Sequence, residues 1–386
     1  MSIPIIRNQH TWLSYLLLAF YGYVLNSLGS LTPFLMEDLN LSYTVSSLHF
    51  TAFAAGILLV GLVGHLLIVP LGGRRSLWFG AFGISLGALM LLAGRTPVIT
   101  ISAAFLMGVI GSLILAVVPS VLSLQYGEQR AVALSEANVV ASLASIFAPL
   151  MVGWFAAFTG TWRSVLALAV AFPVLLWLLL RKNVTKDFAP EIKSANPGRR
   201  SSLPWIYWDF WSMLLLAVAV EFCMVFWSAN YMETGFGLEK TAAAQWVSLF
   251  LLGMILGRLA GSRLVGRFSA QRLVFASLLL ASAGFLLYWL ARSPLLGVAG
   301  LFLTGLGVAN LYPMLLSLAI GSAGEAADQA SARATLASGF AILSLPLLLG
   351  RLADGMGIQT AYGLVGVLLV VLLTVLSVTV GKMRTG

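Results

Sequence analysis

Residues 98–124 read VITISAAFLMGVIGSLILAVVPSVLSL and contain no charged side chain. A run of this length and composition can cross the roughly 30 Å hydrocarbon core of a bilayer as a helix. Similar runs recur along the 386-residue chain, in which 60% of residues are hydrophobic and only 9% are charged. Because a soluble domain carries about 25% charged residues, this composition indicates a protein embedded in a membrane.

Twelve apolar runs predict twelve transmembrane helices. The runs are continuous rather than alternating, which favours helices over a closed barrel. The first six runs lie near residues 12–36, 46–70, 76–94, 98–124, 131–157 and 163–181. The second six lie near residues 208–232, 241–265, 271–291, 295–320, 330–354 and 359–381. We therefore predict an all-α membrane protein.

The basic residues are distributed unequally between the two sides of this topology. The net charge is +9, and most Lys and Arg residues fall in the loops of one side. Cytoplasmic loops carry such an excess, so we expect both termini in the cytoplasm and the chain in the inner membrane. The longest polar connection, residues 182–204, predicts a cytoplasmic linker between an N-terminal bundle (1–181) and a C-terminal bundle (205–386).

Several classes of protein do not fit this sequence. The single cysteine and three histidines do not form a metal-ligand spacing, so we expect no metal and no cofactor. The chain also lacks a nucleotide-binding Gly-Lys loop and a nucleophile with a neighbouring base, which argues against an ATP-driven pump and against an enzyme. Since the positive charge lies in loops between apolar spans, we expect a lipid bilayer as its partner and no nucleic acid.

The two halves of the sequence match each other without gaps at one constant offset, which aligns Arg75 with Arg272. Apolar identities are common by chance in such a chain, but the matches include charged residues and prolines. Further matched pairs are Pro97 and Pro294, Glu128 and Glu325, Pro149 and Pro346, and Gly160 and Gly357. Residues aligned by this offset are called repeat counterparts below. An even number of spans in each half predicts a parallel repeat around an axis normal to the membrane, which is typical of alternating-access transporters.

Three short motifs stand out: Phe20-Tyr21-Gly22 with Asn26 and Pro33, Gly257-Arg258 with Gly261 and Arg267-Phe268, and Asn310 with Pro313 and Ser317-Leu318. In these motifs the chain resembles the fucose-permease branch of the major facilitator superfamily, and over its whole length it resembles that superfamily. The resemblance implies two pseudo-symmetric six-helix bundles around a central cleft. The chain departs from the branch at Ser27 and Ile114, where acidic residues are typical, so the substrate and the protonation residues of that branch do not carry over directly.

A few charges within the predicted spans are candidates for coupling and gating, because ionisable residues in a membrane are functional hypotheses by default. Glu221 lies near the middle of its span and is the predicted proton-coupling residue; the alternative is a permanent structural pair. Glu136 and Arg258 lie at similar depths and are predicted to pair as a cytoplasmic gate. Arg333, the repeat counterpart of Glu136, is predicted to make a second gate contact. Arg258 could instead extend to lipid phosphates.

Polar and aromatic side chains that share helix faces are candidates for substrate contact. Hydroxyl and amide groups suit hydroxyl-bearing solutes, although the same groups also hold membrane helices together. The predicted substrate-binding residues are Tyr23, Asn26, Ser30, Ser142, Ser228, Trp227, Tyr231 and Asn310.

These features together predict a secondary active transporter for a small polar organic solute. Our first hypothesis is a monomeric proton-coupled symporter with a sugar as substrate. The alternative is a proton-coupled multidrug efflux antiporter, because Ala148-Pro149 with Gly153 partly matches a pattern of the superfamily's antiporters. A membrane enzyme or receptor is the different class that we reject.

Overall fold

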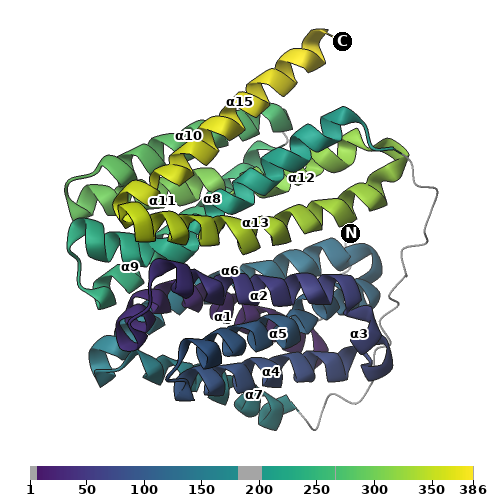
Figure 1. Ribbon diagram of the computed structural model, residues 1–386. Coiled ribbons are helices and arrows are strands. Elements are labelled where there is room, and N and C mark those ends of the chain that lie inside the picture. The colour runs from purple at the N-terminus through teal and green to yellow at the C-terminus, as the bar shows by residue number, and fades with distance from the viewer. Residues whose placement is uncertain (1–6, 181–201, 266, 386) are drawn as a thin grey trace. The chain divides into compact units, whose positions relative to one another are not determined.

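The computed structural model describes residues 7–180, 202–265 and 267–385. The described residues form helices and contain no strand, which confirms the all-α prediction (Figure 1). The predicted linker, residues 182–204, lies largely outside the described ranges. The α-helices are α1 Gln9–Leu39, α2 Tyr43–Val63, α3 His65–Leu71, α4 Gly73–Ala93, α5 Pro97–Tyr126, α6 Arg130–Thr159, α7 Leu166–Leu180, α8 Trp205–Phe236, α9 Lys240–Leu264, α10 Ala270–Leu290, α11 Pro294–Val308, α12 Leu311–Ser322, α13 Ala327–Met356, α14 Ile358–Ala361 and α15 Gly363–Thr385.

Ten segments of the described chain are long and apolar enough to cross a membrane. One of them, Pro97–Thr159, contains two 30-residue helices, α5 and α6. The helix α1 has 31 residues but is not among the ten, because Tyr, Asn and Ser side chains interrupt its apolar run. The prediction of twelve spans is therefore confirmed in part: the helices are present, but apolar content alone identifies ten segments.

The chain divides into two compact units. The N-terminal unit comprises residues 1–31 and 48–194, and the C-terminal unit comprises residues 32–47 and 195–386. The segment 32–47, which holds the end of α1 and the start of α2, thus belongs with the C-terminal unit. The sequence predicts two bundles that are each continuous along the chain, residues 1–181 and 205–386, and this division stays a prediction.

The helix boundaries repeat at the offset found in the sequence. The first residues of α4 and α10, Gly73 and Ala270, are repeat counterparts, and so are their last residues, Ala93 and Leu290. The same offset relates both ends of α6 (Arg130–Thr159) and α13 (Ala327–Met356). Since these two pairs of helices keep their lengths at the same offset, the prediction of two pseudo-symmetric bundles is confirmed.

Equivalent glycines bring equivalent helices close together in each unit. A Cβ atom on Gly108 of α5 would lie 2.2 Å from the backbone oxygen of Phe53 in α2, and one on Gly305 of α11 would lie 2.1 Å from that of Phe250 in α9. Such distances leave no room for a side chain. Gly108 is the repeat counterpart of Gly305, and Phe53 is that of Phe250. The repeat therefore extends to the packing of the backbone, where small residues permit helices to approach closely.

Candidate functional site

The acidic residue Glu221 lies at the midpoint of α8, a helix of 32 residues that runs from Trp205 to Phe236. A rise of 1.5 Å per residue places it about 24 Å from the start of the helix. Its side chain is half-buried and makes no hydrogen bond or ion pair with another described residue. A carboxylate in this position costs free energy in a membrane, so Glu221 is a candidate functional residue.

Arg258 on α9 is the described cation whose electrostatic interaction reaches Glu221. The guanidinium is exposed, and no nitrogen–oxygen distance between the two side chains falls within the 4.0 Å of an ion pair. Both residues belong to the C-terminal unit. In this conformation Glu221 therefore makes no direct ion pair with Arg258, and its role in coupling stays a prediction.

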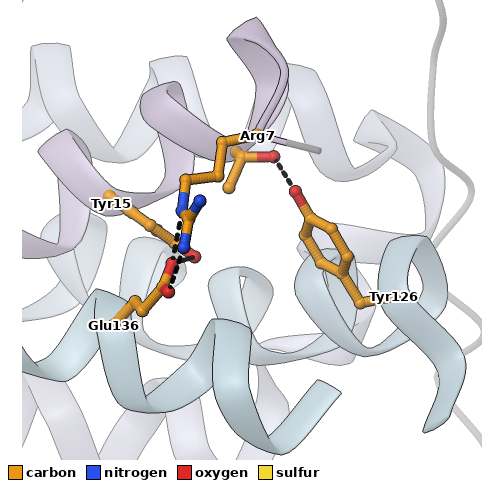
Figure 2. A network of polar contacts seen from close by, with 5 residues as sticks. Arg7, Tyr15, Tyr126 and Glu136 are labelled. Carbon is orange, nitrogen blue, oxygen red and sulfur yellow. Dashed lines mark hydrogen bonds and ion pairs between the residues drawn. The ribbon is translucent and has the colours of Figure 1, made fainter. Parts of the chain in front are cut away.

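Glu136 on α6 is paired inside its own unit. Arg7 donates from Nε to Oε2 at 2.9 Å and from Nη2 to Oε1 at 2.6 Å, and the Tyr15 hydroxyl donates to Oε2 at 3.0 Å. Figure 2 shows both side chains directed at this carboxylate. The hydrogen bonds to Glu136 raise the pKa of Arg7 above its ordinary value. The predicted partner Arg258 lies in the other unit, and the gate between Glu136 and Arg258 stays a prediction.

Beside this network, the Tyr126 hydroxyl at the end of α5 bonds to the Thr11 hydroxyl on α1. Gln125 also donates from Nε2 to the Thr11 hydroxyl at 2.9 Å. The start of α1 is thus fixed to both α5 and α6 by polar contacts.

Arg333 on α13 lies beside aromatic side chains of α8. Its guanidinium carbon is 5.3 Å from the centre of the Trp208 ring, and its backbone oxygen accepts a hydrogen bond from Trp211 Nε1 at 2.9 Å. A cation over an indole ring gains electrostatic stabilisation. Arg333 and its repeat counterpart Glu136 therefore both contact the first helix of their own unit, α8 and α1 respectively. The gate role of Arg333 stays a prediction.

Asn26 fixes α1 to α6 at a close crossing. Its Nδ2 atom donates to the Gly22 backbone oxygen at 2.9 Å and to the Ser145 hydroxyl at 3.1 Å. A Cβ atom on Gly22 would lie 3.0 Å from the Ser145 hydroxyl oxygen. Asn26 is half-buried, and its Oδ1 atom accepts no hydrogen bond from the described residues. This oxygen can accept a hydrogen bond from a solute.

Tyr23, one helical turn before Asn26, lines two hollows of the N-terminal unit. One is a cavity of about 10 Å³ against Ser27 and Met107, and the other is a groove of about 480 Å³ along α1, α6 and α7. The Tyr23 hydroxyl is buried and has no hydrogen-bond partner among the described residues. A buried hydroxyl without a partner is costly, so the Tyr23 hydroxyl is a candidate contact for a ligand or a water molecule.

The other two candidates of the N-terminal unit differ in exposure. Ser30 is fully buried, whereas Ser142 is half-buried and its hydroxyl makes no hydrogen bond with a described residue. Of the two, Ser142 is the more exposed, and substrate contact by either residue stays a prediction.

Asn310 lies where α11 ends and α12 begins. Its Nδ2 atom donates to the Gly257 backbone oxygen at 2.8 Å, and the side chain packs directly on Gly261. The helix is interrupted here, just before Pro313, whose ring cannot continue a regular hydrogen-bond ladder. Asn310 therefore connects the interrupted helix to α9, at the residue next to Arg258.

The three candidates on the C-terminal half of α8 lie in a packed core. Trp227 is fully buried and donates from Nε1 to the Pro346 backbone oxygen at 3.0 Å. The Ser228 hydroxyl lies 3.1 Å from the Tyr362 hydroxyl, and the Tyr231 hydroxyl donates to the Trp289 backbone oxygen at 2.9 Å. Their polar groups are thus occupied by the protein itself, which favours a structural role over the predicted substrate contact.

The structure groups the predicted residues by unit. It brings Tyr23 and Asn26 together on α1, and it brings Glu221 near Arg258. Sequence reasoning missed Arg7 as the partner of Glu136, because a basic residue before the first span also serves to orient the chain in the membrane. It also missed Asp354, whose carboxylate accepts two backbone hydrogen bonds; a charge at the end of a span gives no signal of such a bond.

Apolar membrane-length helices and two repeated bundles define a multi-pass membrane protein. A family model described as "Major Facilitator Superfamily" matches residues 11–245 and 210–384. The chain belongs to this family, as the sequence motifs predicted.

Relatives and solved structures agree with this assignment. An uncharacterised MFS-type transporter of Yersinia pestis is 25% identical over 203 residues, so the match spans about half of each chain (52% and 53%). The glucose/mannose transporter GlcP of Bacillus subtilis is 26% identical over 77% of this chain and 76% of its own. The crystal structure of a bacterial homologue of the human lysosomal transporter Spinster has a TM-score of 0.79 at 12% identity, over 98% of this chain and 97% of that one. This likeness shows the fold alone.

Proposed function

We propose that the chain is a secondary active transporter that moves a small polar organic solute, with a sugar as the best candidate, in symport with protons. Glu221 binds and releases the proton. The observation that carries the proposal is a half-buried carboxylate at the midpoint of α8 that lacks a direct partner among the described residues. A carboxylate that is free of a permanent ion pair can change its protonation state during transport, whereas one held by a cation cannot do so readily.

The sugar assignment is supported by open polar groups and by one relative. The Tyr23 hydroxyl and the Asn26 Oδ1 atom have no partner among the described residues, and such groups favour solutes that can hydrogen-bond to them. GlcP, described as a glucose/mannose transporter, aligns with about three quarters of the chain. We further propose that both termini lie in the cytoplasm, that the membrane is the inner membrane and that the protein acts as a monomer.

The second candidate function is efflux of apolar drugs in exchange for protons. It is favoured by the groove of about 480 Å³ in the N-terminal unit, which Phe20, Phe147 and Phe172 line and in which Tyr23 provides the hydroxyl. A largely apolar groove suits an apolar ligand better than a sugar.

Proteoliposomes with an imposed pH gradient test both candidates. We expect external acid to drive accumulation of labelled glucose or mannose, and sugar addition to make the external medium alkaline. The Glu221→Gln variant should lose at least about 10-fold of the gradient-driven accumulation while it still exchanges labelled for unlabelled sugar, because only the proton step is removed. The matched control is Glu128→Gln, an exposed acid in the loop after α5.

The outcomes separate the proposals. Accumulation by Glu221→Gln at the wild-type level would refute the coupling role. Proton release that is driven by a dye, together with no response to sugars, would establish the efflux antiporter instead.

A further inference from the structure

The two units pack one equivalent pair of helices differently: α4 against α7 in the N-terminal unit, and α10 against α15 in the C-terminal unit. In the first pair the Ser85 hydroxyl of α4 donates to the backbone oxygen of Ala169 in α7 at 3.0 Å. The repeat counterparts of these residues are Ser282 of α10 and Gly366 of α15. Ser282 is half-buried, and its hydroxyl makes no hydrogen bond with another described residue. The bond that joins the first pair of helices is therefore not made in the second.

An apolar hollow of about 380 Å³ lies between α10 and α15 at this place, and Ser282 lines it. The Phe285 and Trp289 rings also line it on α10, and Gly363 lines it on α15, where α7 has the larger Leu166. The lining residue Leu286 is exposed, so the hollow opens to the surface of the chain. On a helix that spans a membrane, such a surface meets the acyl chains of lipids.

A second and more polar cavity, of about 650 Å³, lies between the first turn of α10 and the last turns of α15. Its lining includes Arg272 and Phe275 from α10, and Ser377 and Gly381 from α15. The Arg272 side chain is exposed, and its guanidinium makes no hydrogen bond or ion pair with another described residue. This polar cavity therefore presents an available positive charge beside an aromatic ring.

The backbone of α10 adds to the positive potential of the polar cavity. Ser269, which also lines the cavity, caps α10 by accepting the backbone N–H of Arg272 at 3.4 Å. The first N–H groups of a helix favour an anion. The opposite, carbonyl end of α15 lies further out, because this helix continues to Thr385 and extends beyond the other helices of its unit (Figure 1). Since the lining that the structure describes contains no acidic residue, the polar cavity suits an anion.

An exposed tryptophan marks the depth of the polar cavity in the membrane. Lys382 follows the lining residue Gly381, and its ammonium nitrogen lies 5.0 Å from the centre of the Trp205 ring. Trp205 is exposed and is the first residue of α8. Tryptophans at the ends of membrane helices lie at the level of the lipid headgroups. An anion in the polar cavity therefore lies at the depth of lipid phosphate.

The polar cavity and the apolar hollow lie along one groove between α10 and α15. Arg272, Phe275 and Ser282 are spaced by three and seven residues, so they share one face of α10. The ten residues from Arg272 to Ser282 correspond to about 15 Å of helix. One leaflet contributes half of the roughly 30 Å hydrocarbon core. An acyl chain that begins beside Arg272 therefore ends at the apolar hollow.

We propose that this groove binds one anionic phospholipid, with its phosphate at Arg272 and the start of α10 and one acyl chain directed into the apolar hollow. Basic pockets between membrane helices bind anionic headgroups in this way. In the N-terminal unit Arg75 has the same charge at the same helix position, but Leu180 replaces Ser377 and a hydrogen bond joins α4 to α7. The lipid site is therefore specific to the C-terminal unit, and it does not depend on which solute the protein moves.

Native mass spectrometry of the purified protein in detergent, titrated with lipid, tests the site. Phosphatidylglycerol, whose headgroup carries one negative charge, is the probe, and phosphatidylcholine with the same acyl chains is the comparison. We expect the first phosphatidylglycerol to bind at least about 5-fold more tightly than the first phosphatidylcholine, the factor for one basic residue at an anionic lipid surface. Equal affinities would overturn the proposed headgroup contact.

Two variants separate the charge of the site from its space. Arg272→Gln should weaken the binding of the first phosphatidylglycerol about 5-fold. Gly381→Leu keeps every charge and should weaken it by a similar factor, because the new side chain enters the polar cavity. A Cβ atom on Gly381 meets nothing within 4 Å, and leucine is the better helix former, so the helix tolerates this change. Wild-type affinity in either variant would contradict the site.

Arg75→Gln is the matched control, since Arg75 is an exposed arginine at the start of α4 and the repeat counterpart of Arg272. We expect it to leave the first phosphatidylglycerol as tightly bound as in the wild type. Equal losses in Arg75→Gln and Arg272→Gln would reduce the effect to general surface charge and overturn the site. Thermal unfolding without added lipid checks each variant, and if Gly381→Leu does not fold, the two arginine variants decide.

Inorganic phosphate distinguishes a lipid from a free anion. The immobilised protein, loaded with phosphatidylglycerol, is washed with millimolar phosphate before the bound lipid is measured. We expect the lipid to stay bound, because its acyl chain adds apolar contact that phosphate does not replace. Loss of the lipid in this wash, but not in a wash with chloride at equal ionic strength, would show a site for free phosphate and would refute the lipid.

Discussion

The N-terminal and C-terminal units share several helix boundaries but not all of their charges. Three charged residues of the C-terminal unit have uncharged repeat counterparts: Val24 for Glu221, Gly61 for Arg258 and Ala157 for Asp354. Backbone packing constrains both units equally, because the same helices must cross at the same glycines. A charge within a membrane costs free energy, so a charge that is present in one unit and absent from its counterpart points to function rather than to folding.

The two units also satisfy one equivalent backbone oxygen by different means. Arg163 donates to the oxygens of Leu91, Leu92 and Gly94 at the end of α4, at 2.7–2.9 Å. In the C-terminal unit the counterpart of Leu92 is Trp289, whose oxygen accepts from the Tyr231 hydroxyl. In the N-terminal unit the donor is a charged guanidinium that reaches three carbonyl oxygens, whereas in the C-terminal unit it is a neutral hydroxyl that reaches one.

The largest expected effect comes from removing the charged donor. Arg163→Leu should lower the free energy of unfolding by about 3 kcal/mol, because hydrogen bonds to a charged group are worth more than neutral ones and the buried carbonyls lose their partner. Tyr231→Phe should cost only about 0.5–1.5 kcal/mol. Unfolding in mixed micelles measures both, with Arg351→Leu as an exposed control. Equal costs for the two variants would contradict this comparison.

A smaller effect should be the same in both units. Gly108→Ala and Gly305→Ala each place a Cβ atom 2.1–2.2 Å from a backbone oxygen, and we expect each to cost about 1–3 kcal/mol of unfolding free energy through overpacking. Gly61→Ala, whose Cβ atom meets nothing within 4 Å, controls for the higher helix propensity of alanine. A large difference between the two crossings would show that the repeat does not extend to packing energetics.

The smallest effect concerns the cytoplasmic ends that the topology predicts for α1 and α8. Tyr15→Phe removes the hydrogen bond to Glu136, and Trp211→Phe removes the one to the Arg333 backbone oxygen. Trp211→Phe removes a neutral hydrogen bond and should cost about 0.5–1.5 kcal/mol, whereas Tyr15→Phe removes one to a partly exposed carboxylate and should cost about 1.5 kcal/mol. Only the Tyr15 contact involves an ion pair, so added salt at high concentration should reduce its contribution and leave that of Trp211 unchanged. The same unfolding assay at two salt concentrations checks this, and equal salt dependence would argue against the assignment.

The sequence predicted the repeat well because its offset is set by glycines, prolines and loop lengths, which act locally and leave a direct pattern. It predicted the mid-helix position of Glu221, because a carboxylate in the middle of a span is easy to recognise, while the coupling role of this residue stays a prediction. It did not predict the partners of charges near span ends. Arg7 and Asp354 lie where polar residues are expected in any topology, and only the tertiary packing brings Arg7 to Glu136 and Asp354 to α2.

The predicted substrate residues show the same limit. Asn26 and Trp227 were proposed for their depth and chemistry, yet depth does not distinguish a side chain that faces a cleft from one that packs against a neighbouring helix. In the structure Asn26 keeps an open oxygen, whereas Trp227 is enclosed between α13 and the start of α2. The spacing of polar residues along one helix does not show whether their common face meets a cleft or another helix, because that other helix is distant in the sequence.

The constant spacing of the helix boundaries has an evolutionary consequence. From α4 to α6 and from α10 to α13, the two halves keep one constant offset: three residues precede both α5 and α11, and α6 and α13 begin at repeat counterparts. Divergence after a duplication therefore proceeded there by replacement of side chains and not by insertion, so neither half acquired an added lid or an appended domain in these turns. Selectivity in such a protein has to be encoded on the helices, and exchanging single side chains between matched positions is the natural route to altering it.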